Sequence, residues 1–163
     1  SPYIELPKKL TVKQNLEVYG RLYDIKNLSS KIEHLVEKLR LNEIIYKITG
    51  ELSSGQKNRV SLAKSIINNP AVLLLDEPTA SLDPETGDFV RSFLENYQKE
   101  NKASILLASH NMAEVERLCS FVLMMKNGVI IDQDSPKALI EKHGRKNLEE
   151  VFLKLTREKY ESK

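Results

Sequence analysis

The sequence lacks the features that mark secreted and membrane-spanning chains. It has one cysteine, Cys119, so no disulfide can form within the chain, which fits a reducing compartment. No apolar run approaches the roughly 20 residues needed to span a bilayer. The opening residues, SPYIELPKKL, hold no hydrophobic signal segment and no initial Met. We therefore expect a piece of a longer protein.

The sequence also lacks an excess of charge of either sign. The 163 residues carry a formal net charge of +2, with 29% charged and 40% hydrophobic residues. This composition is typical of a globular domain, and it shows none of the strong positive charge that binds nucleic acid or an anionic membrane. We therefore expect no nucleic-acid partner.

A phosphate-binding loop is missing too, although one stretch comes close to it. Gly50 and Gly55 lie five residues apart and Lys57 follows them. The loop G-x-x-x-x-G-K-[ST] needs its lysine directly after the second glycine, to reach the phosphates, and then a hydroxyl to hold Mg²⁺. Gln56 and Lys57 occupy these two positions, so the match fails. No other glycine in the chain starts such a pattern.

The first half of the chain is predicted to be helical. Thr11 with Gln14 three residues later resembles a capping box, and Ser30 with Glu33 repeats the pattern. Apolar residues at helical spacing follow each of them. A third helix is predicted from about residue 54 to 68, ending before a proline.

The second half alternates strands and helices. The apolar runs at 71–75 and 103–109 are predicted to be strands buried on both faces. Helices are predicted at 84–100 and 112–119, and Asn127-Gly128 predicts a hairpin. This order indicates an α/β fold with a parallel sheet covered by helices and an antiparallel edge hairpin.

Two more helices are predicted near the end of the chain. Ser135 and Pro136 start the first and Gly144 ends it, and Asn147 with Glu150 caps the second. The expected organisation is therefore a helical part at 1–69, a core at 70–134 and a helical extension at 135–163.

Acidic residues follow the first predicted strand. Asp76 stands at its carboxyl end, where open α/β sheets bind ligands, and a carboxylate there can hold Mg²⁺. Glu77 comes next and could orient and partly deprotonate an attacking water. The alternative is that both residues only form a turn before Pro78.

Two further polar residues stand at element ends. Asp83 precedes Pro84 and fits a helix N-cap, a role that needs no nucleotide. His110 follows the second predicted strand, on the sheet edge that carries Asp76, where it could hydrogen-bond a phosphate oxygen. A purely structural role is the alternative for His110.

Taken in order, these motifs resemble those of the ATP-binding subunits of ABC transporters. LSSGQ resembles the ABC signature, VLLLDEP the Walker B motif with its catalytic glutamate, SLD the D-loop and SH the switch histidine. The segment NLEEVFLKLT resembles ABC ATPases of the drug- and polysaccharide-export type. The resemblance implies a RecA-like P-loop NTPase core with an ABC α-helical subdomain, and it places the family's Walker A loop before Ser1.

The resemblance also assigns roles to residues. It implies that Asp76 positions Mg²⁺, that Glu77 polarises the attacking water and that His110 contacts the γ-phosphate. Asp83 would link two sites across a head-to-tail dimer of ATPase domains. The helix start formed by Ser53, Ser54, Gly55 and Gln56 would offer its N–H groups to an ATP held by the other domain. Ser54 stands where the family most often has glycine.

The implied whole protein is an ATP hydrolase on the cytoplasmic face of the cell membrane. Its cofactors would be ATP and Mg²⁺, and residues 8–69 would meet a transmembrane permease. The chain alone is expected to be inactive because it has no Walker A loop. Three alternatives stay open: a signature-side partner that does not hydrolyse ATP, a soluble ABC-type ATPase and a degenerate paralogue.

Overall fold

The computed structural model describes residues 6–80 and 82–158. The chain divides into two compact units, Ser1–Ala108 and Ser109–Lys163. Within the described ranges, no helix is both long enough and apolar enough to cross a membrane.

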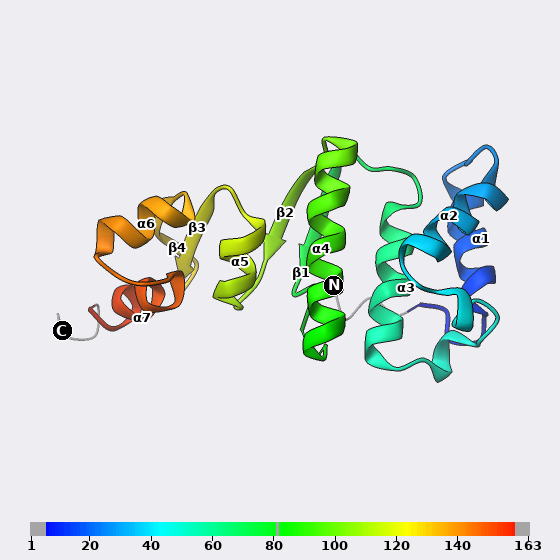
Figure 1. Ribbon diagram of the computed structural model, residues 1–163, viewed down its shortest axis with the longest axis horizontal. Helices are drawn as coiled ribbons and strands as arrows, with labels where there is room; N and C mark the ends of the chain where they lie inside the picture. Colours follow the sequence, from blue (N-terminus) through cyan, green and yellow to red (C-terminus); the bar gives the residue numbers. More distant parts are fainter. Residues whose placement is uncertain (1–5, 81, 159–163) are drawn as a thin grey trace. The chain divides into compact units, whose positions relative to one another are not determined.

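Three helices form the first part of the first unit (Figure 1): α1 (Val12–Leu22), α2 (Leu28–Lys38) and α3 (Ser54–Ile66). Short 3-10 helices at Asn42–Ile44 and Thr49–Glu51 lie between the last two. The capping box predicted at the first helix is confirmed. The Thr11 hydroxyl accepts from the Gln14 amide, and the Gln14 side chain accepts from the Thr11 amide. α3 ends slightly earlier than predicted.

The predicted cap of the second helix is wrong. α2 begins at Leu28 rather than after Ser30, and it follows Asn27, whose backbone is left-handed and whose side chain caps nothing. The cause is a tertiary contact, because a Cβ atom at Gly20 would lie 2.1 Å from a methyl carbon of Leu28. The bare glycine of α1 thus leaves the space that Leu28 fills, and this packing starts the helix before the serine pair.

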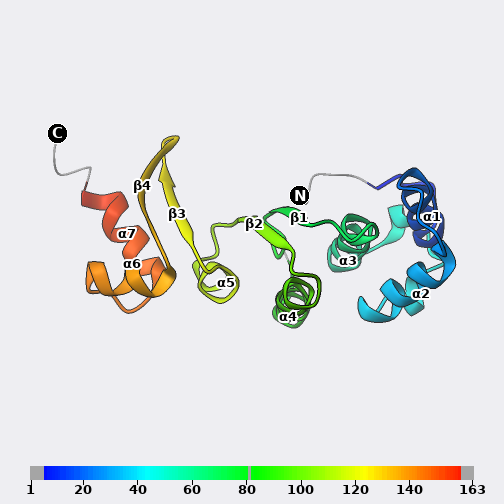
Figure 2. The ribbon, with the colours of Figure 1, turned by 90° about the horizontal axis from the view of Figure 1, so that it is seen from above.

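The sheet of the first unit is parallel, as predicted. β1 (Val72–Asp76) pairs with β2 (Ser104–Ala108), and the helix α4 (Pro84–Asn101) connects them. Figure 2 shows α4 on one face of the strand pair. Its buried residues are Gly87, Val90, Leu94 and Tyr97.

The prediction that both strands are buried on both faces is wrong. In β1, Leu73 and Leu75 are buried whereas Leu74 is 68% exposed, and Leu106 of β2 is 64% exposed. An apolar run is buried on both faces only where a layer covers each face. The described residues of the first unit cover one face of the strand pair, so successive side chains alternate between buried and exposed.

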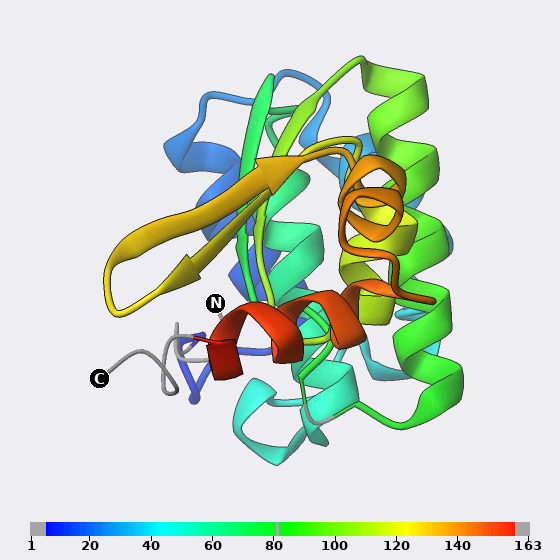
Figure 3. The same ribbon diagram turned by 90° about the vertical axis from the view of Figure 1, so that its left-hand side faces the viewer.

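The second unit holds a hairpin and three helices (Figure 3). They are α5 (Met112–Leu118), β3 (Val122–Lys126), β4 (Val129–Asp134), α6 (Pro136–His143) and α7 (Leu148–Glu158). Asn127 and Gly128 both have positive φ, as the tightest hairpin turn requires. The predicted boundaries of the last two helices are confirmed: Ser135 caps α6, Gly144 ends it with a φ of 60°, and Asn147 accepts from the Glu150 amide.

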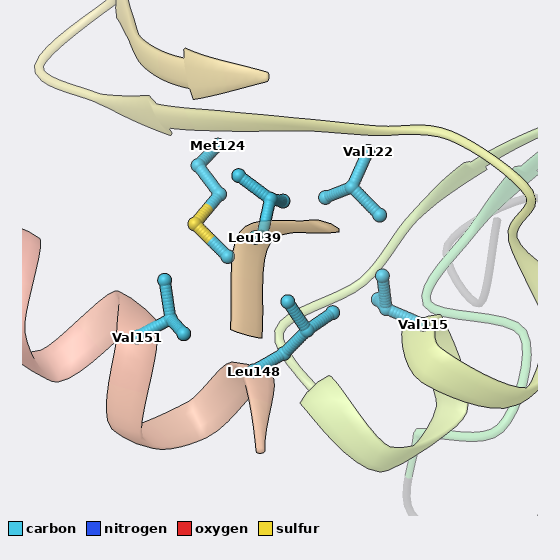
Figure 4. Packing of buried hydrophobic residues seen from close by; sticks show 6 residues of the cluster. All are labelled: Val115, Val122, Met124, Leu139, Leu148 and Val151. Atoms are coloured by element: carbon cyan, nitrogen blue, oxygen red, sulfur yellow. The ribbon is translucent and has the colours of Figure 1, made fainter. Parts of the chain in front are cut away.

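One apolar core joins the elements of this unit, with Ile131 of β4 packed against it. Figure 4 shows side chains from α5, β3, α6 and α7 pointing toward one another. They are Val115, Val122, Met124, Leu139, Leu148 and Val151. Cys119 packs against the edge of this cluster, and burial together with the negative charge of Glu114 raises the pKa of its thiol. Cys119 is therefore a partly buried packing residue.

Candidate functional site

Asp76 and Glu77 lie at the carboxyl end of β1. Asp76 is the last residue of the strand and is exposed. The chain turns sharply after it, and the Glu77 amide donates a hydrogen bond of 2.8 Å to the carbonyl oxygen of Ala108 at the end of β2. The side-chain amide of Asn58 on α3 donates to the carbonyl oxygen of Pro78 at 2.6 Å. The turn that carries Glu77 is thus held by both the sheet and α3.

The backbone of Glu77 is in an uncommon conformation. Its φ is 49°, in the left-handed region that glycine or asparagine usually occupies. A residue held in such a region costs about 1–3 kcal/mol, and such residues are concentrated at functional sites. Asp24, Arg40 and Lys102 have a similar positive φ at turns and helix ends, so the conformation shows strain at Glu77 but does not by itself show a function.

The start of α3 carries the LSSGQ motif. The Ser53 hydroxyl accepts from the Gln56 amide at 3.3 Å, and the Gln56 side chain accepts from the Ser53 amide at 3.0 Å. The next two amides, of Ser54 and Gly55, have no acceptor among the described residues. Unpaired amides at the positive end of a helix attract anions. The Ser53 hydroxyl accepts in this box, so its proton can still be donated.

Gly55 brings the start of α3 close to the start of α4. A Cβ atom at Gly55 would lie 3.4 Å from the methyl carbon of Thr86 and 3.9 Å from a methyl carbon of Leu82. Asp83 is the N-cap of α4, and its carboxylate accepts from the Thr86 amide at 2.9 Å. This hydrogen bond holds the pKa of Asp83 below its usual value. Ser81, the first residue of the SLD motif, lies outside the described residues.

A cleft of about 520 Å³ in the first unit brings two of the predicted residues together. Ser54 of α3 and Asp76 of β1 both line it. Lys8, Lys57 and Lys64 line it as well and add positive charge to its walls. The other predicted residues of this unit lie outside the lining: Ser53, Gly55, Gln56, Glu77 and Asp83.

The residues at this cleft fit Mg²⁺ held mainly by a nucleotide. In the described part of the chain, no group of three His, Cys, Asp or Glu side chains could hold a metal by itself. Mg²⁺ at phosphate sites usually takes one or two carboxylates and completes its shell with waters and phosphate oxygens. Asp76, exposed at the strand end, fits the single carboxylate ligand of such a site.

His110 belongs to the second unit and is exposed two residues after β2 ends. Both of its neighbours are held by Glu114 of α5. The Ser109 hydroxyl donates to the Glu114 carboxylate at 2.7 Å, and the Asn111 side chain accepts from the Glu114 amide at 3.1 Å. Sequence reasoning missed Glu114. Asn111 with an acidic residue three positions later is a helix-start pattern that would have indicated it.

Comparison with known proteins finds similarity to the ATP-binding proteins of ABC transporters. The family model described as ABC transporter matches residues 3–80. The protein named ABC transporter ATP-binding protein NatA from Bacillus subtilis (strain 168) is 32% identical over 147 residues, which are 89% of this chain and 59% of that protein. The Nod factor export ATP-binding protein I of Rhizobium sp. (strain N33) is 36% identical over 90% of this chain and 49% of its own length. This chain therefore spans about half to three fifths of these relatives.

Two solved structures have the same fold. One, described as the ATP binding subunit of an ABC transporter, has a TM-score of 0.81 over 93% of this chain and 65% of its own. Its sequence identity is 23%, so this likeness concerns the fold alone. The other is cbiO1 of Clostridium perfringens, described as part of the ABC transporter complex cbiONQ. It has a TM-score of 0.72 at 31% identity, over 87% of this chain and 57% of its own.

Proposed function

Because this chain belongs to the family of ABC transporter ATP-binding proteins, we propose that it forms part of an ATP hydrolase that drives transport through a membrane permease. ATP binding and hydrolysis take place between two such domains, and the direction of transport is export. The observation that carries this proposal is the turn after β1, which places Glu77 directly after Asp76 at the strand's carboxyl end and is held by both β2 and α3.

The start of α3 is proposed to complete the ATP site of a second domain. The amides of Ser54 and Gly55 and the Ser53 hydroxyl are donors at the positive end of the helix. Such donors stabilise the negative charge that a γ-phosphate carries. Gln56 fixes this geometry by closing the capping box with Ser53. Asp83 caps α4 beside Gly55 and is proposed to face the second domain.

The end of β1 is proposed to serve the ATP held by this protein itself. Asp76 holds Mg²⁺, which neutralises phosphate charge when it is bound. The Glu77 carboxylate accepts a proton from the attacking water and orients it. His110 donates a hydrogen bond to the γ-phosphate. Phosphoryl transfer depends mainly on positioning and charge neutralisation, and these residues can supply both.

The remaining partners follow from the same proposal. Residues 8–69 contact the permease, so the protein works on the cytoplasmic face of the membrane. A second candidate function is a signature-side partner that completes another chain's ATP site without hydrolysing ATP. The donors at the start of α3 are the observation that favours that reading.

Two measurements test the proposal. In titration calorimetry with Mg-ATP, we expect the 163-residue chain alone to show neither micromolar binding nor turnover. A chimera is then made in which this chain replaces the matching part of the Bacillus subtilis relative, whose N-terminal part is expected to carry the phosphate-binding loop. We expect this chimera to hydrolyse ATP and Glu77→Gln to lower kcat by roughly 100-fold or more.

Glu51→Gln is the matched control for that substitution, because Glu51 is an exposed glutamate in the same unit. We expect it to leave kcat unchanged. A chimera that unfolds cooperatively but does not hydrolyse ATP would overturn the proposed function. Equal rates for wild type and Glu77→Gln would overturn the role of Glu77 alone.

A further inference from the structure

Glu114 is a buried carboxylate that the proposed mechanism does not use. Its side chain belongs to the first turn of α5 and is 1% exposed. Burying a carboxylate is costly unless hydrogen bonds satisfy it. One of those bonds comes from the Ser109 hydroxyl at 2.7 Å. One oxygen of the buried carboxylate is therefore bonded to the residue that precedes His110.

The hydrogen bonds around Glu114 form a closed ring. The Ser109 hydroxyl donates to the Glu114 carboxylate and accepts from the Asn111 amide at 3.1 Å. The Asn111 side chain in turn accepts from the Glu114 amide at 3.1 Å. His110 lies in sequence between the two held residues, so its backbone is fixed on both sides while its own side chain stays exposed.

Capping of α5 does not explain the buried carboxylate. The Asn111 side chain already accepts from the Glu114 amide, which is the usual N-cap bond. That bond uses the backbone of Glu114 and would form with other side chains at this position. The carboxylate adds the bond to Ser109, and this bond fixes the hydroxyl that accepts from the Asn111 amide.

We propose that Glu114 is a positioning residue for His110. Through the Ser109 hydroxyl it holds the backbone of residues 109–111 in the conformation that presents the imidazole. The contact of His110 with a phosphate belongs to the proposed function, on which this inference rests. The conformation of residues 109–111 does not depend on that function and can be measured in the chain as it is.

The first test measures hydrogen exchange in the 163-residue chain. Glu114→Ala removes the acceptor of the Ser109 hydroxyl, so we expect the Asn111 amide to exchange roughly tenfold faster. Glu114→Gln keeps an acceptor oxygen and is expected to stay close to wild type. Ser109→Ala removes the acceptor of the Asn111 amide directly and sets the exchange rate expected when this hydrogen bond is absent.

Glu116 provides a matched control on the same helix. Its carboxylate accepts from the Leu148 amide at 2.5 Å and so caps α7, away from His110. We expect Glu116→Ala to lower stability and to leave the Asn111 exchange rate unchanged. If the Asn111 amide keeps its wild-type rate in Glu114→Ala, the carboxylate does not hold the segment and the proposal is wrong, even where Ser109→Ala exchanges faster.

The second test uses the ATP-hydrolysing chimera. Glu114→Ala should lower kcat roughly tenfold with little change in KM, Glu114→Gln should restore most of the rate, and Glu116→Ala should leave it unchanged. In a His110→Ala background, Glu114→Ala should have no further effect on kcat, because a positioning residue acts only through the residue it positions. If Glu114→Ala lowers kcat in the His110→Ala background as much as it does in the wild type, the proposal is wrong.

Failure of the proposed function and failure of the positioning role of Glu114 give different results. A folded wild-type chimera that does not hydrolyse ATP overturns the proposed function, and the exchange rates then still decide whether Glu114 holds residues 109–111. A wild-type chimera that hydrolyses ATP as fast as its Glu114→Ala variant overturns the positioning role and leaves the proposed function standing.

Discussion

The backbone amide of Glu77 donates a hydrogen bond of 2.8 Å to the carbonyl oxygen of Ala108, and this bond ties a left-handed residue at the end of β1 to the last residue of β2. The same strand ends form the last pair of the parallel ladder, Asp76 with Ala108. The side chain proposed to act on water is therefore presented by a strained residue that both strands hold in place.

Glu77 can be tested for strain by comparing two small substitutions. Both Glu77→Ala and Glu77→Gly remove the side chain, but only glycine adopts a φ of 49° without a Cβ clash. We expect Glu77→Gly to be more stable than Glu77→Ala by about 1 kcal/mol in denaturant unfolding. Equal stabilities would show that the backbone is not strained. Both variants should be inactive in the chimera.

Gly55→Ala separates the function of the α3 start from its packing. The new methyl carbon would lie 3.4 Å from that of Thr86, which is ordinary contact, so stability should change by less than about 1 kcal/mol. A phosphate that approaches the Gly55 amide would meet the methyl group. We expect ATP hydrolysis by the chimera to fall roughly tenfold or more at unchanged Tm. Unchanged hydrolysis would contradict a close approach to this amide.

Asp83 can be tested as a cap by two substitutions. Alanine removes the acceptor of the Thr86 amide, whereas asparagine is as good an N-cap as aspartate. We expect Asp83→Ala to lower the Tm by a few degrees and Asp83→Asn to leave it nearly unchanged. If Asp83→Asn nonetheless slows hydrolysis by the chimera, the carboxylate charge acts beyond the cap.

The ion pairs of Asp132 make the stability of the second unit sensitive to acid. Lys142, at 2.8 Å, and His143, at 2.6 Å, hold the pKa of this carboxyl at about 2, below its usual 3.8. A group whose pKa is lower in the folded state stabilises above its unfolded pKa, and this contribution is lost as pH falls through the folded pKa. The loss should therefore occur between about pH 4 and pH 2.

Asp132→Asn should remove this contribution at neutral pH. The pKa shift corresponds to roughly 2.4 kcal/mol, and solvent screening reduces it, so we expect the substitution to lower the free energy of unfolding by about 1–2 kcal/mol. NMR signals of the second unit measure the unfolding. Asp134→Asn on the same strand is the control, because Asp134 accepts a local backbone hydrogen bond and joins no ion pair among the described residues. Equal acid sensitivity of the two variants would contradict the role of Asp132.

Local signals in the sequence predicted most of the elements. The caps at Thr11, Asp83, Ser135 and Asn147 are short-range hydrogen bonds between residues three positions apart, so the residue types themselves indicate them. The hairpin at Asn127-Gly128 is equally local, because both residues tolerate positive φ.

The errors concern effects that depend on distant residues. The start of α2 depends on the packing of the Leu28 side chain against Gly20 of α1. The residues next to Leu28 in the sequence give no sign of this contact. The exposure of Leu74 and Leu106 depends on which layers cover the sheet, and an apolar run contains no such information. The proposed roles of Glu77 and His110 and the division of the chain into three parts remain predictions.

The hydrogen bond between Asn58 and Pro78 has a mechanical consequence. The helix α3, whose first turn is proposed to face a second domain, also donates a 2.6 Å hydrogen bond from Asn58 to the turn that follows Glu77. A displacement of α3 would therefore move Pro78 directly through this hydrogen bond. If α3 moves as one piece, a ligand bound at its first turn and a ligand bound at the turn after β1 must alter each other's affinity by the same factor, since coupling between binding sites is reciprocal. Communication between two ATP molecules would then need no long relay of residues, because a single helix contacts both half-sites.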